Sequence, residues 1–358
     1  MSTTPFPAGL DAGAAPRRIL LTGASSGIGF QAALQLRRAG HALVLPCRDG
    51  ATAEATLRRL AETDRGAAGG GAGAGPEPLA PVCDLGDLES VERCAAELTR
   101  RGEPIDSLVL NAGLQYTGAP EPQVSAQGLE LTIAVNHLAH QLLAQRLLPL
   151  LVAGRDPRLV VTASEVHDPA AAGGRVGSPA GLGDLAGLRQ GLKPADGFPM
   201  VDGVSPFDAD KAYKDSKLCN VLFAREAERR LREQGQSLPV IAWSPGLVIP
   251  RSSGGFFRRS RLHNEWGQRL FALVARDLLR LTESVENAGA RLAGFAAAAS
   301  PKPAGFSYFS NRVLGPGHLR FEAVSPSAEA LDDAKARELW SVSARLLGTE
   351  GLATEGLG

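Results

Sequence analysis

Short apolar runs alternate with amphipathic segments through most of the 358-residue chain. The runs have the length of buried strands, and the segments between them have the apolar spacing of helices. Such alternation is typical of βαβ units. Strands are therefore predicted at residues 18–22, 42–46, 79–82, 107–110, 158–162, 239–243 and 305–309, and helices at residues 29–38, 51–61, 88–101, 129–151, 211–234 and 285–298.

This order predicts an α/β fold, a Rossmann-type doubly wound parallel sheet of about seven strands with helices on both faces. The apolar fraction of 44% is ample for one core, so we expect a single domain. The predicted divisions are a disordered leader at 1–16, a Rossmann-type domain at 17–347 and a tail at 348–358, with a low-complexity loop at 66–78, a long insert at 168–210 and a lid at 251–281 inside the domain. The basic, apolar segment 251–281 could alternatively be a helix that packs on the core or touches a membrane.

Charge and cysteine content narrow the class of protein. The chain has 38 basic and 38 acidic residues, so the totals give no reason to expect a nucleic-acid partner. Its four cysteines lack C-x-x-C spacing and are predicted to be free thiols in a reducing compartment. Neither a signal peptide nor a run of about 18 apolar residues is evident. We expect a cytoplasmic protein, and peripheral contact with an internal membrane remains open.

A glycine-rich turn follows the first predicted strand and opens a helix. Glycines let the backbone approach a pyrophosphate, and the helix N-terminus offers free N–H groups to an anion. The turn therefore predicts a dinucleotide-binding site made by Thr22, Gly23, Ser25, Ser26, Gly27, Ile28 and Gly29.

Arg48, just after the second predicted strand, indicates which dinucleotide binds. An enzyme that selects NAD is expected to carry an acidic residue there for the ribose 2′-hydroxyl. A guanidinium instead suits a 2′-phosphate, which favours NADPH as the cofactor. Alternatively, Arg48 is a solvated residue that pairs with the adjacent Asp49.

Tyr213 and Lys217 are spaced four residues apart in a predicted helix, so they share one face. An ammonium near a phenol favours the phenolate, and Lys217 is therefore expected to lower the pKa of Tyr213 toward neutral pH. This pair predicts that Tyr213 is a general acid.

Three motifs together resemble the short-chain dehydrogenase/reductase family over residues 17–347: the turn at 22–29, Asn111-Ala112-Gly113, and Tyr213-x-x-x-Lys217. Within that family the chain is similar to the light-dependent protochlorophyllide oxidoreductase branch. That likeness is carried by the length of the insert and by the segments at 136–138, 182–185, 200–203, 212–220 and 334–340.

The resemblance implies four catalytic residues. Tyr213 would donate a proton, and Lys217 would hold the nicotinamide ribose. Ser164 would orient the substrate oxygen or the phenol, and Asn136 would anchor a water in a relay to Lys217. The resemblance also implies that the cofactor contacts Tyr213 and Lys217 together with Asp84, Leu85, Asn111, Ala112, Gly113, Pro245 and Gly246.

Tyr116, His167 and Cys219 are candidates for contact with substrate. Cys219 matches a cysteine that the pigment branch keeps near its ligand, although a buried cysteine in a helix is as readily a small hydrophobe. No metal is predicted, because the histidines at 137, 140 and 167 lack metal-ligand spacing.

The segment after Gly246 departs from the family pattern. Pro250 and Arg251 stand where a threonine would contact the nicotinamide carboxamide, and Leu247 stands where the pigment reductases have cysteine. Ser252 or Ser253 could replace that threonine contact.

Three functions therefore remain open. The first is an NADPH-dependent reductase of a conjugated C=C or C=O, with a small hydrophobic substrate such as a tetrapyrrole. The second is a dark carbonyl or retinol-type dehydrogenase, and the third is a non-catalytic NADPH-binding sensor or pigment carrier. The resemblance also allows a homodimer paired through the helices at 129–151 and 211–234.

Overall fold

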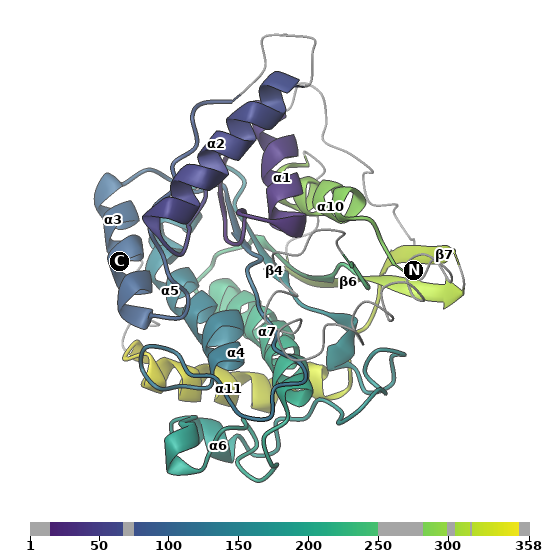
Figure 1. The fold of residues 1–358 in the computed structure, drawn as a ribbon. Coiled ribbons are helices and arrows are strands. Elements are labelled where there is room, and N and C mark those ends of the chain that lie inside the picture. The colour runs from purple at the N-terminus through teal and green to yellow at the C-terminus, as the bar shows by residue number, and fades with distance from the viewer. Residues whose placement is uncertain (1–14, 67–74, 250–281, 299–304, 316, 351–358) are drawn as a thin grey trace.

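The computed structural model describes residues 15–66, 75–249, 282–298, 305–315 and 317–350 (Figure 1). The predicted lid at 251–281 lies outside the described residues, as do nearly all of the leader, most of the low-complexity loop and the end of the tail.

One seven-stranded sheet forms the centre of the protein, with strand order β2-β1-β3-β4-β5-β6-β7. All neighbouring strands run parallel except β6 and β7, which form an antiparallel pair at one edge. The strands are β1 (Arg18–Leu21), β2 (Ala42–Val44), β3 (Ser107–Leu110), β4 (Arg158–Thr162), β5 (Pro239–Ser244), β6 (Gly305–Gly315) and β7 (His318–Ala323). The predicted doubly wound α/β fold is confirmed.

The prediction was wrong about one strand and missed another. Residues 79–82 lie parallel to β2 but make only isolated bridges, from Leu79 to Val44 and from Val82 to Cys47. Pro81 has no N–H to donate, which limits a continuous ladder here. The missed strand is β7, whose side chains are mostly half-buried or exposed, so it lacks the apolar run that marked the other strands.

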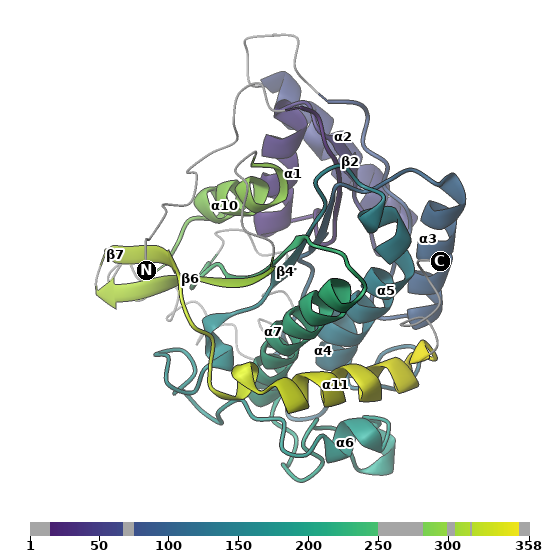
Figure 2. The same cartoon turned by 180° about the vertical axis from the view of Figure 1, so that it is seen from behind.

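Helices cover both faces of the sheet (Figures 1 and 2). They are α1 (Gly27–Arg38), α2 (Gly50–Gly66), α3 (Leu88–Arg101), α4 (Leu131–Ile133), α5 (Ala139–Val152), α6 (Ala186–Arg189), α7 (Ala209–Glu233), α10 (Val285–Ala297) and α11 (Asp333–Leu346). Short 3₁₀ segments are η2 (Glu165–His167), η3 (Pro194–Asp196) and η5 (Glu329–Leu331), and a π-helical segment, η1 (Ala134–Leu138), joins α4 to α5.

Alternate residues of the central strands enter two separate apolar cores. Ile19 and Leu21 of β1 join a cluster with α1 and α10, whereas Leu20 faces the cluster that includes α3, α5, α7 and α11. This burial on both faces explains why the central strands read as continuous apolar runs.

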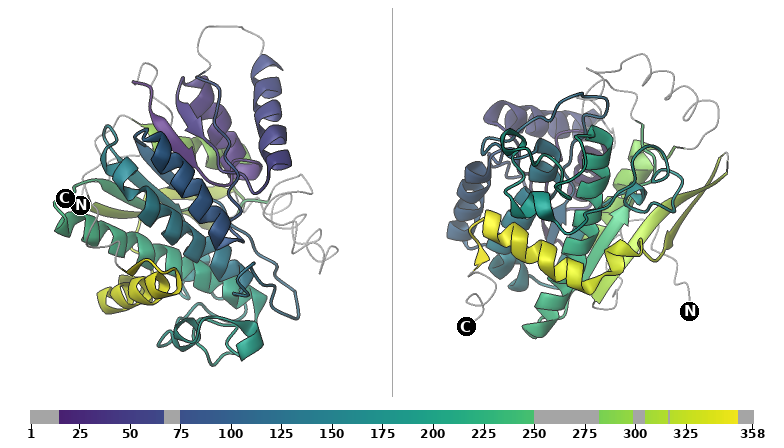
Figure 3. Two further views of the ribbon diagram at one scale, coloured as in Figure 1. Left: turned by 90° about the vertical axis from the view of Figure 1, so that its left-hand side faces the viewer. Right: turned by 90° about the horizontal axis from the view of Figure 1, so that it is seen from below.

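The helix α11 packs along α7, and it also touches α5 (Figure 3). The Trp340 ring stacks on Phe223 of α7 with centroids 5.6 Å apart, and the Arg230 guanidinium lies 4.8 Å from the centroid of the same Trp340 ring. These contacts place the C-terminal helix across the faces that the sequence proposed for subunit pairing.

Candidate active site

The turn between β1 and α1 is closely packed at two glycines and open at a third. Gly23 has a left-handed φ of 74°, and a Cβ there would lie 2.8 Å from the Cα of Ala112. A Cβ on Gly29 would come within 2.3 Å of the Gly23 carbonyl oxygen. At Gly27, where φ is 56°, a Cβ would meet nothing within 4 Å. The turn is therefore open on the side from which a pyrophosphate could approach its amides.

The start of α1 is suited to an anion. Ser26 is the N-cap, its side chain makes no capping hydrogen bond, and the first turn has no acidic residue. The first N–H groups of a helix lack partners within it, and the helix dipole is positive at this end. With the open surface at Gly27, these groups fit the pyrophosphate of a dinucleotide, and Ser25 and Ile28 lie in the same turn.

Thr22 fastens this turn to the segment after β3. Its hydroxyl oxygen accepts hydrogen bonds from the amides of Asn111 and Ala112, at 2.9 and 3.0 Å. The Asn111 side chain donates to the Thr22 carbonyl at 3.1 Å. The structure therefore brings together the first two predicted cofactor segments.

Arg48 is largely exposed, with a side chain 58% accessible to solvent, and its Nε donates to Asp49 at 3.0 Å. The pairing that the sequence allowed is thus present. Exposed pairs contribute little to stability, so the guanidinium can turn to a phosphate at small cost. Its contact with a 2′-phosphate stays a prediction.

Two predicted cofactor contacts lie farther along the same sheet edge. Asp84 begins the turn that leads into α3, where its carboxylate accepts from the Gly86 amide at 2.9 Å, and Leu85 follows it as a half-buried residue. Their contact with the adenine ring also stays a prediction.

The Pro245-Gly246 turn is fixed by two residues that sequence reasoning missed. Gly246 has a φ of 78°, and a Cβ there would lie 2.8 Å from the Asn311 carbonyl oxygen. The Asn311 amide donates to the buried Glu283 carboxylate at 2.9 Å, and the Glu283 amide donates to the Leu247 carbonyl at 2.9 Å. No motif includes Asn311 or Glu283, so only their contacts reveal this role. Residues 250–253, where the sequence departs from the family, lie outside the described residues.

Asn136 lies in the π-helical segment η1, fully buried. Its side-chain oxygen accepts from the Leu114 amide at 2.8 Å, and its amide nitrogen donates to the Leu114 carbonyl and the Ser216 hydroxyl, both at 3.0 Å. A Cβ on Gly113 would lie 3.2 Å from the Asn136 side-chain oxygen and 3.6 Å from the Lys217 Nζ. Asn136, Gly113 and Lys217 therefore converge on one point.

Tyr213, Ser164 and Lys217 meet at the carboxyl end of β4. The Ser164 hydroxyl, two residues beyond that strand, hydrogen-bonds the Tyr213 phenol. The Lys217 Nζ donates to the Thr162 carbonyl at 3.1 Å and lies 5.6 Å from the Tyr213 ring centroid. The four residues named as catalytic are thus neighbours in space, although their chemical roles stay predictions.

The expected effect of Lys217 on Tyr213 was wrong for this structure. Burial raises the pKa of Tyr213 above its ordinary value, while the hydrogen bond with Ser164 acts in the opposite direction. Burial also lowers the pKa of Lys217 to about 7, so the ammonium is only partly charged at neutral pH. With its pKa raised, the phenol stays protonated at neutral pH, which is the form that a proton donor requires.

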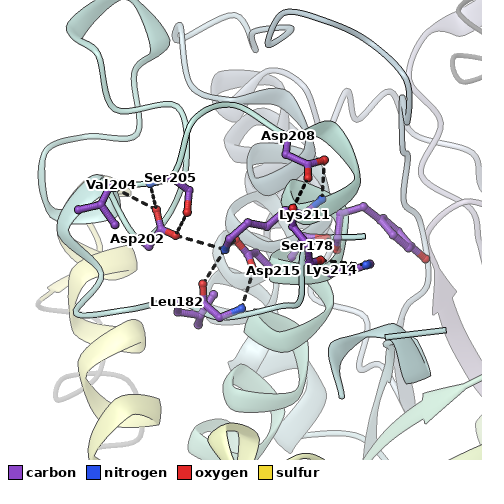
Figure 4. A network of polar contacts seen from close by, with 12 residues as sticks. Ser178, Leu182, Asp202, Val204, Ser205, Asp208, Lys211, Lys214 and Asp215 are labelled. Atoms are coloured by element: carbon purple, nitrogen blue, oxygen red, sulfur yellow. Dashed lines mark hydrogen bonds and ion pairs between the residues drawn. The ribbon is translucent and has the colours of Figure 1, made fainter. Parts of the chain in front are cut away.

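The first turns of α7 hold the insert in place with charges on a different set of side chains (Figure 4). Lys211 donates to the Asp215 carboxylate at 2.7 Å and to the Gly181 carbonyl at 2.8 Å, and it also pairs with Asp202 at 3.3 Å. The other oxygen of Asp215 accepts from the Gly181 amide at 2.9 Å.

A second contact of the same kind ties the insert to α7 one turn away. Lys214 donates to the carbonyls of Val176 and Ser178 and pairs with Asp210 at 3.0 Å. The Ser178 hydroxyl donates to the helix-capping Asp208 at 2.7 Å. The segment that contains Tyr213 and Lys217 is therefore also the anchor of the insert.

The three residues predicted to contact substrate are buried in this structure. Tyr116 is 0% exposed and its hydroxyl donates to the buried Glu130 carboxylate. His167 is 1% exposed, held between the Ser164 carbonyl and the Ser327 amide. Cys219 is 0% exposed, and burial raises the pKa of its thiol, so the small-hydrophobe interpretation holds. Burial and these polar partners depend on the folded chain, so the local sequence around each residue does not record them.

The other two histidines near the site in sequence, His137 and His140, are buried and neutral. Burial lowers the pKa of His137 to about 3 and that of His140 to about 4. Within the described ranges, no three His, Cys, Asp and Glu side chains gather as metal ligands. In the same ranges, no helix is both long and apolar enough to cross a bilayer.

Known proteins are similar to this chain in both sequence and structure. Residues 17–176 match the model of the short chain dehydrogenase family. The chain is 35% identical to protochlorophyllide reductase A of Oryza sativa, over 92% of this chain and 80% of that protein. It is 34% identical to protochlorophyllide reductase of Avena sativa, over 92% of this chain and 99% of that protein.

Solved structures repeat the fold over most of the chain. An uncharacterised protein from Mycobacterium paratuberculosis has a TM-score of 0.63 and 27% identity, with 96% of this chain and 98% of that chain covered. The L-sorbose reductase of Gluconobacter frateurii has a TM-score of 0.59 and 17% identity, with 86% of this chain and 99% of that chain covered. The sequence identity to the plant reductases, extending over nearly the whole chain, is decisive: this chain belongs to the short-chain dehydrogenase/reductase family of oxidoreductases.

Proposed function

We propose that the protein is an NADPH-dependent reductase that adds hydrogen to a conjugated C=C or C=O of a small hydrophobic substrate. The observation that carries this proposal is the convergence of Asn136, Ser164, Tyr213 and Lys217 beside the Pro245-Gly246 turn, at the same sheet edge as the glycine-rich turn.

Bound NADPH would supply the hydride. Tyr213 supplies the proton from its phenol, and the two together saturate the double bond. Ser164 holds the phenol oxygen in position, and Lys217, fixed by the Thr162 carbonyl, presents its amine to the cofactor ribose. Asn136 keeps the segment after β3 at a constant distance from Lys217.

The cofactor proposal rests on the turn and on Arg48. The open surface at Gly27 and the free start of α1 fit a pyrophosphate, and Arg48 offers a guanidinium at the end of β2. No acidic residue of the kind that selects NAD stands at the Arg48 position.

The substrate proposal is a tetrapyrrole of the protochlorophyllide type. It is supported by the identity of 32–35% to the protochlorophyllide reductases of plants and an alga, which covers 92% of this chain. The test is illumination of the protein with NADPH and protochlorophyllide, followed by absorbance spectroscopy. We expect a red shift of the pigment band that needs both light and NADPH, and its absence would remove this substrate.

A dark dehydrogenase of hydrophobic aldehydes is the second candidate. It is favoured by Leu247, which stands where the pigment reductases have cysteine. Oxidation of NADPH by retinal-type aldehydes in darkness, with no pigment conversion under light, would select it. A sensor without catalysis is disfavoured, because it would have no need for the complete catalytic set.

Location and assembly are also matters of proposal. We infer a cytoplasmic protein whose contact with a membrane, if present, is peripheral. A homodimer through α5 and α7 would have to include α11 in its interface, because α11 packs against both helices.

A further inference from the structure

Arg59 of α2 is bound to the glycine-rich turn from outside. Its guanidinium lies over the Phe30 ring, 3.7 Å from the centroid, and its Nη1 donates to the Ser25 carbonyl at 3.4 Å. Ser25 belongs to the turn itself, and Phe30 lies in the first turn of α1. The side chain therefore spans the gap between α2 and the start of the cofactor site.

These two contacts leave most of the guanidinium available. Stacking uses one face of the plane, and the Ser25 carbonyl takes one of its five N–H donors. Arg59 is exposed, so the edge of the guanidinium reaches solvent. Among the described residues no carboxylate lies within ion-pair distance of it, in contrast to Arg38 with Asp64 and Arg48 with Asp49.

Among the described residues, the Arg59 guanidinium beside the positive end of α1 has no carboxylate partner, so it is available to an anion that binds there. The helix dipole already concentrates positive potential at Ser26, and Arg48 adds a second cation after β2. Arg59 and the start of α1, which meet at Ser25 and Ser26, suit a group with more than one negative charge, such as a phosphate monoester, and Arg48 follows the neighbouring strand β2.

We propose that Arg59 is a second guanidinium for the 2′-phosphate of NADPH, acting with Arg48, and that it sets the preference for NADPH over NADH. This inference rests on the NADPH-dependent activity proposed above. Stacking on Phe30 fixes the plane of Arg59, so that less side-chain freedom is lost when the phosphate binds.

The test is a measurement of Kd for NADPH and for NADH by fluorescence titration of the wild-type protein and of Arg59→Leu. Charge-assisted hydrogen bonds contribute about 1.5–3 kcal/mol, so we expect NADPH binding to weaken about 10-fold to 100-fold. Binding of NADH should change less than about twofold, because NADH lacks the phosphate. Arg58→Leu is the matched control, since Arg58 is exposed on the same helix, and it should leave both constants unchanged.

Two further measurements distinguish recognition of the 2′-phosphate by Arg59 from a purely structural role of Arg59 in the glycine-rich turn. Arg59→Lys keeps a charge without the planar fork and should give an intermediate Kd for NADPH. The fragment 2′,5′-ADP should lose affinity in Arg59→Leu, whereas 5′-AMP should not. Equal weakening of NADPH and NADH, or an unchanged Kd for NADPH, would overturn the inference. If the wild-type protein binds no NADPH at all, the proposed function fails instead.

Discussion

Two ends of the site are built by different means. At the cofactor end the backbone itself makes the shape, through Gly23, Gly29 and the hydroxyl of Thr22. At the insert end, buried charges on α7 hold a long irregular segment by its carbonyls and carboxylates, as Lys211 does with Gly181 and Asp202. The two ends share α7, whose Tyr213 and Lys217 serve the reaction between them.

The difference teaches where sequence is informative. A glycine demanded by a close backbone approach has a fixed place in a motif, so the cofactor end can be located without a structure. A buried ion pair has no such signature, because lysines and aspartates on a helix usually lie in solvent. The length of the insert can therefore be recognised in the sequence, but the ion pairs that hold it can be identified only in the folded chain.

Replacement of Tyr213 by phenylalanine should greatly slow the chemical step while it leaves the cofactor end and the insert end intact. Loss of a general acid typically costs about 10²–10⁴-fold in rate, and we expect turnover to fall by that amount while the Kd for NADPH stays within about twofold. Steady-state kinetics and fluorescence titration check this. Tyr116→Phe is the matched control and should keep its turnover, because Tyr116 is a core residue. Unchanged turnover in Tyr213→Phe would contradict its assignment as the proton donor.

Lys211→Met should disrupt the insert end alone. It leaves Asp215 buried without its ammonium, and breaking a buried pair costs about 3–5 kcal/mol in the free energy of unfolding. We expect faster proteolysis within residues 168–210 and little change in NADPH binding. The double variant Lys211→Met, Asp215→Leu should recover much of the loss in denaturant unfolding. Equal losses in the single and double variants would show that the charges do not act as a pair.

Gly29→Ala should disrupt the cofactor end alone. Its Cβ would lie 2.3 Å from the Gly23 carbonyl oxygen, so the turn must shift at a cost of about 1–3 kcal/mol. NADPH binding should weaken at least tenfold, with the insert as resistant to protease as in the wild-type protein. Gly50→Ala is the control, because a Cβ there meets nothing within 4 Å. Normal NADPH affinity in Gly29→Ala would show that the turn is more tolerant than its packing indicates.

Replacement of Lys217 by methionine has the smallest expected effect, which is a change in the free energy of unfolding and in its dependence on pH. Burial lowers its pKa from about 10.4 in the unfolded chain to about 7, so between these values the unfolded state binds more protons and stability rises with pH. Lys217→Met removes this term. The pKa change corresponds to at most about 4 kcal/mol at pH 7, and loss of the hydrogen bond from Lys217 to the Thr162 carbonyl offsets part of it. The variant without cofactor should therefore be about 1–3 kcal/mol more stable than wild type at pH 7, with the gap closing toward pH 10. Thermal unfolding at several pH values, with the exposed Lys193→Met as control, checks the sign, and a gap that widens with pH would contradict it.

Much of the fold could be predicted because each central strand is buried on both faces. The strands at residues 107–110 and 158–162 match their predicted bounds to the residue, since an uninterrupted apolar run of this length between polar segments is typical of a buried strand. Two segments were predicted incorrectly. Residues 79–82 have the apolar character of a strand, but Pro81 reduces them to bridges, and β7 is too exposed to show an apolar run.

The site was predictable to the extent that its motifs fix backbone shape. Thr22 and Asn111 lie together as expected, because the carboxyl ends of parallel strands share one edge of the sheet. The protonation states of Tyr213 and Lys217 could not be predicted from the motif. The pKa values of Tyr213 and Lys217 depend on how completely the folded chain excludes water from each, and no spacing of residues records that.

The π-helical segment η1 shows that part of the site is encoded by the number of residues rather than by their identity. The Ala139 amide bonds to the Ala134 carbonyl, five residues back, so this turn contains one residue more than an α-helical turn. Deletion of a single residue here would restore regular α-helix and rotate what precedes it by about 100° relative to α5. The Asn136 amide would then leave Leu114 and Ser216, even with every side chain of the motif retained. A scan by substitution would pass over this dependence, and a scan by deletion would find it.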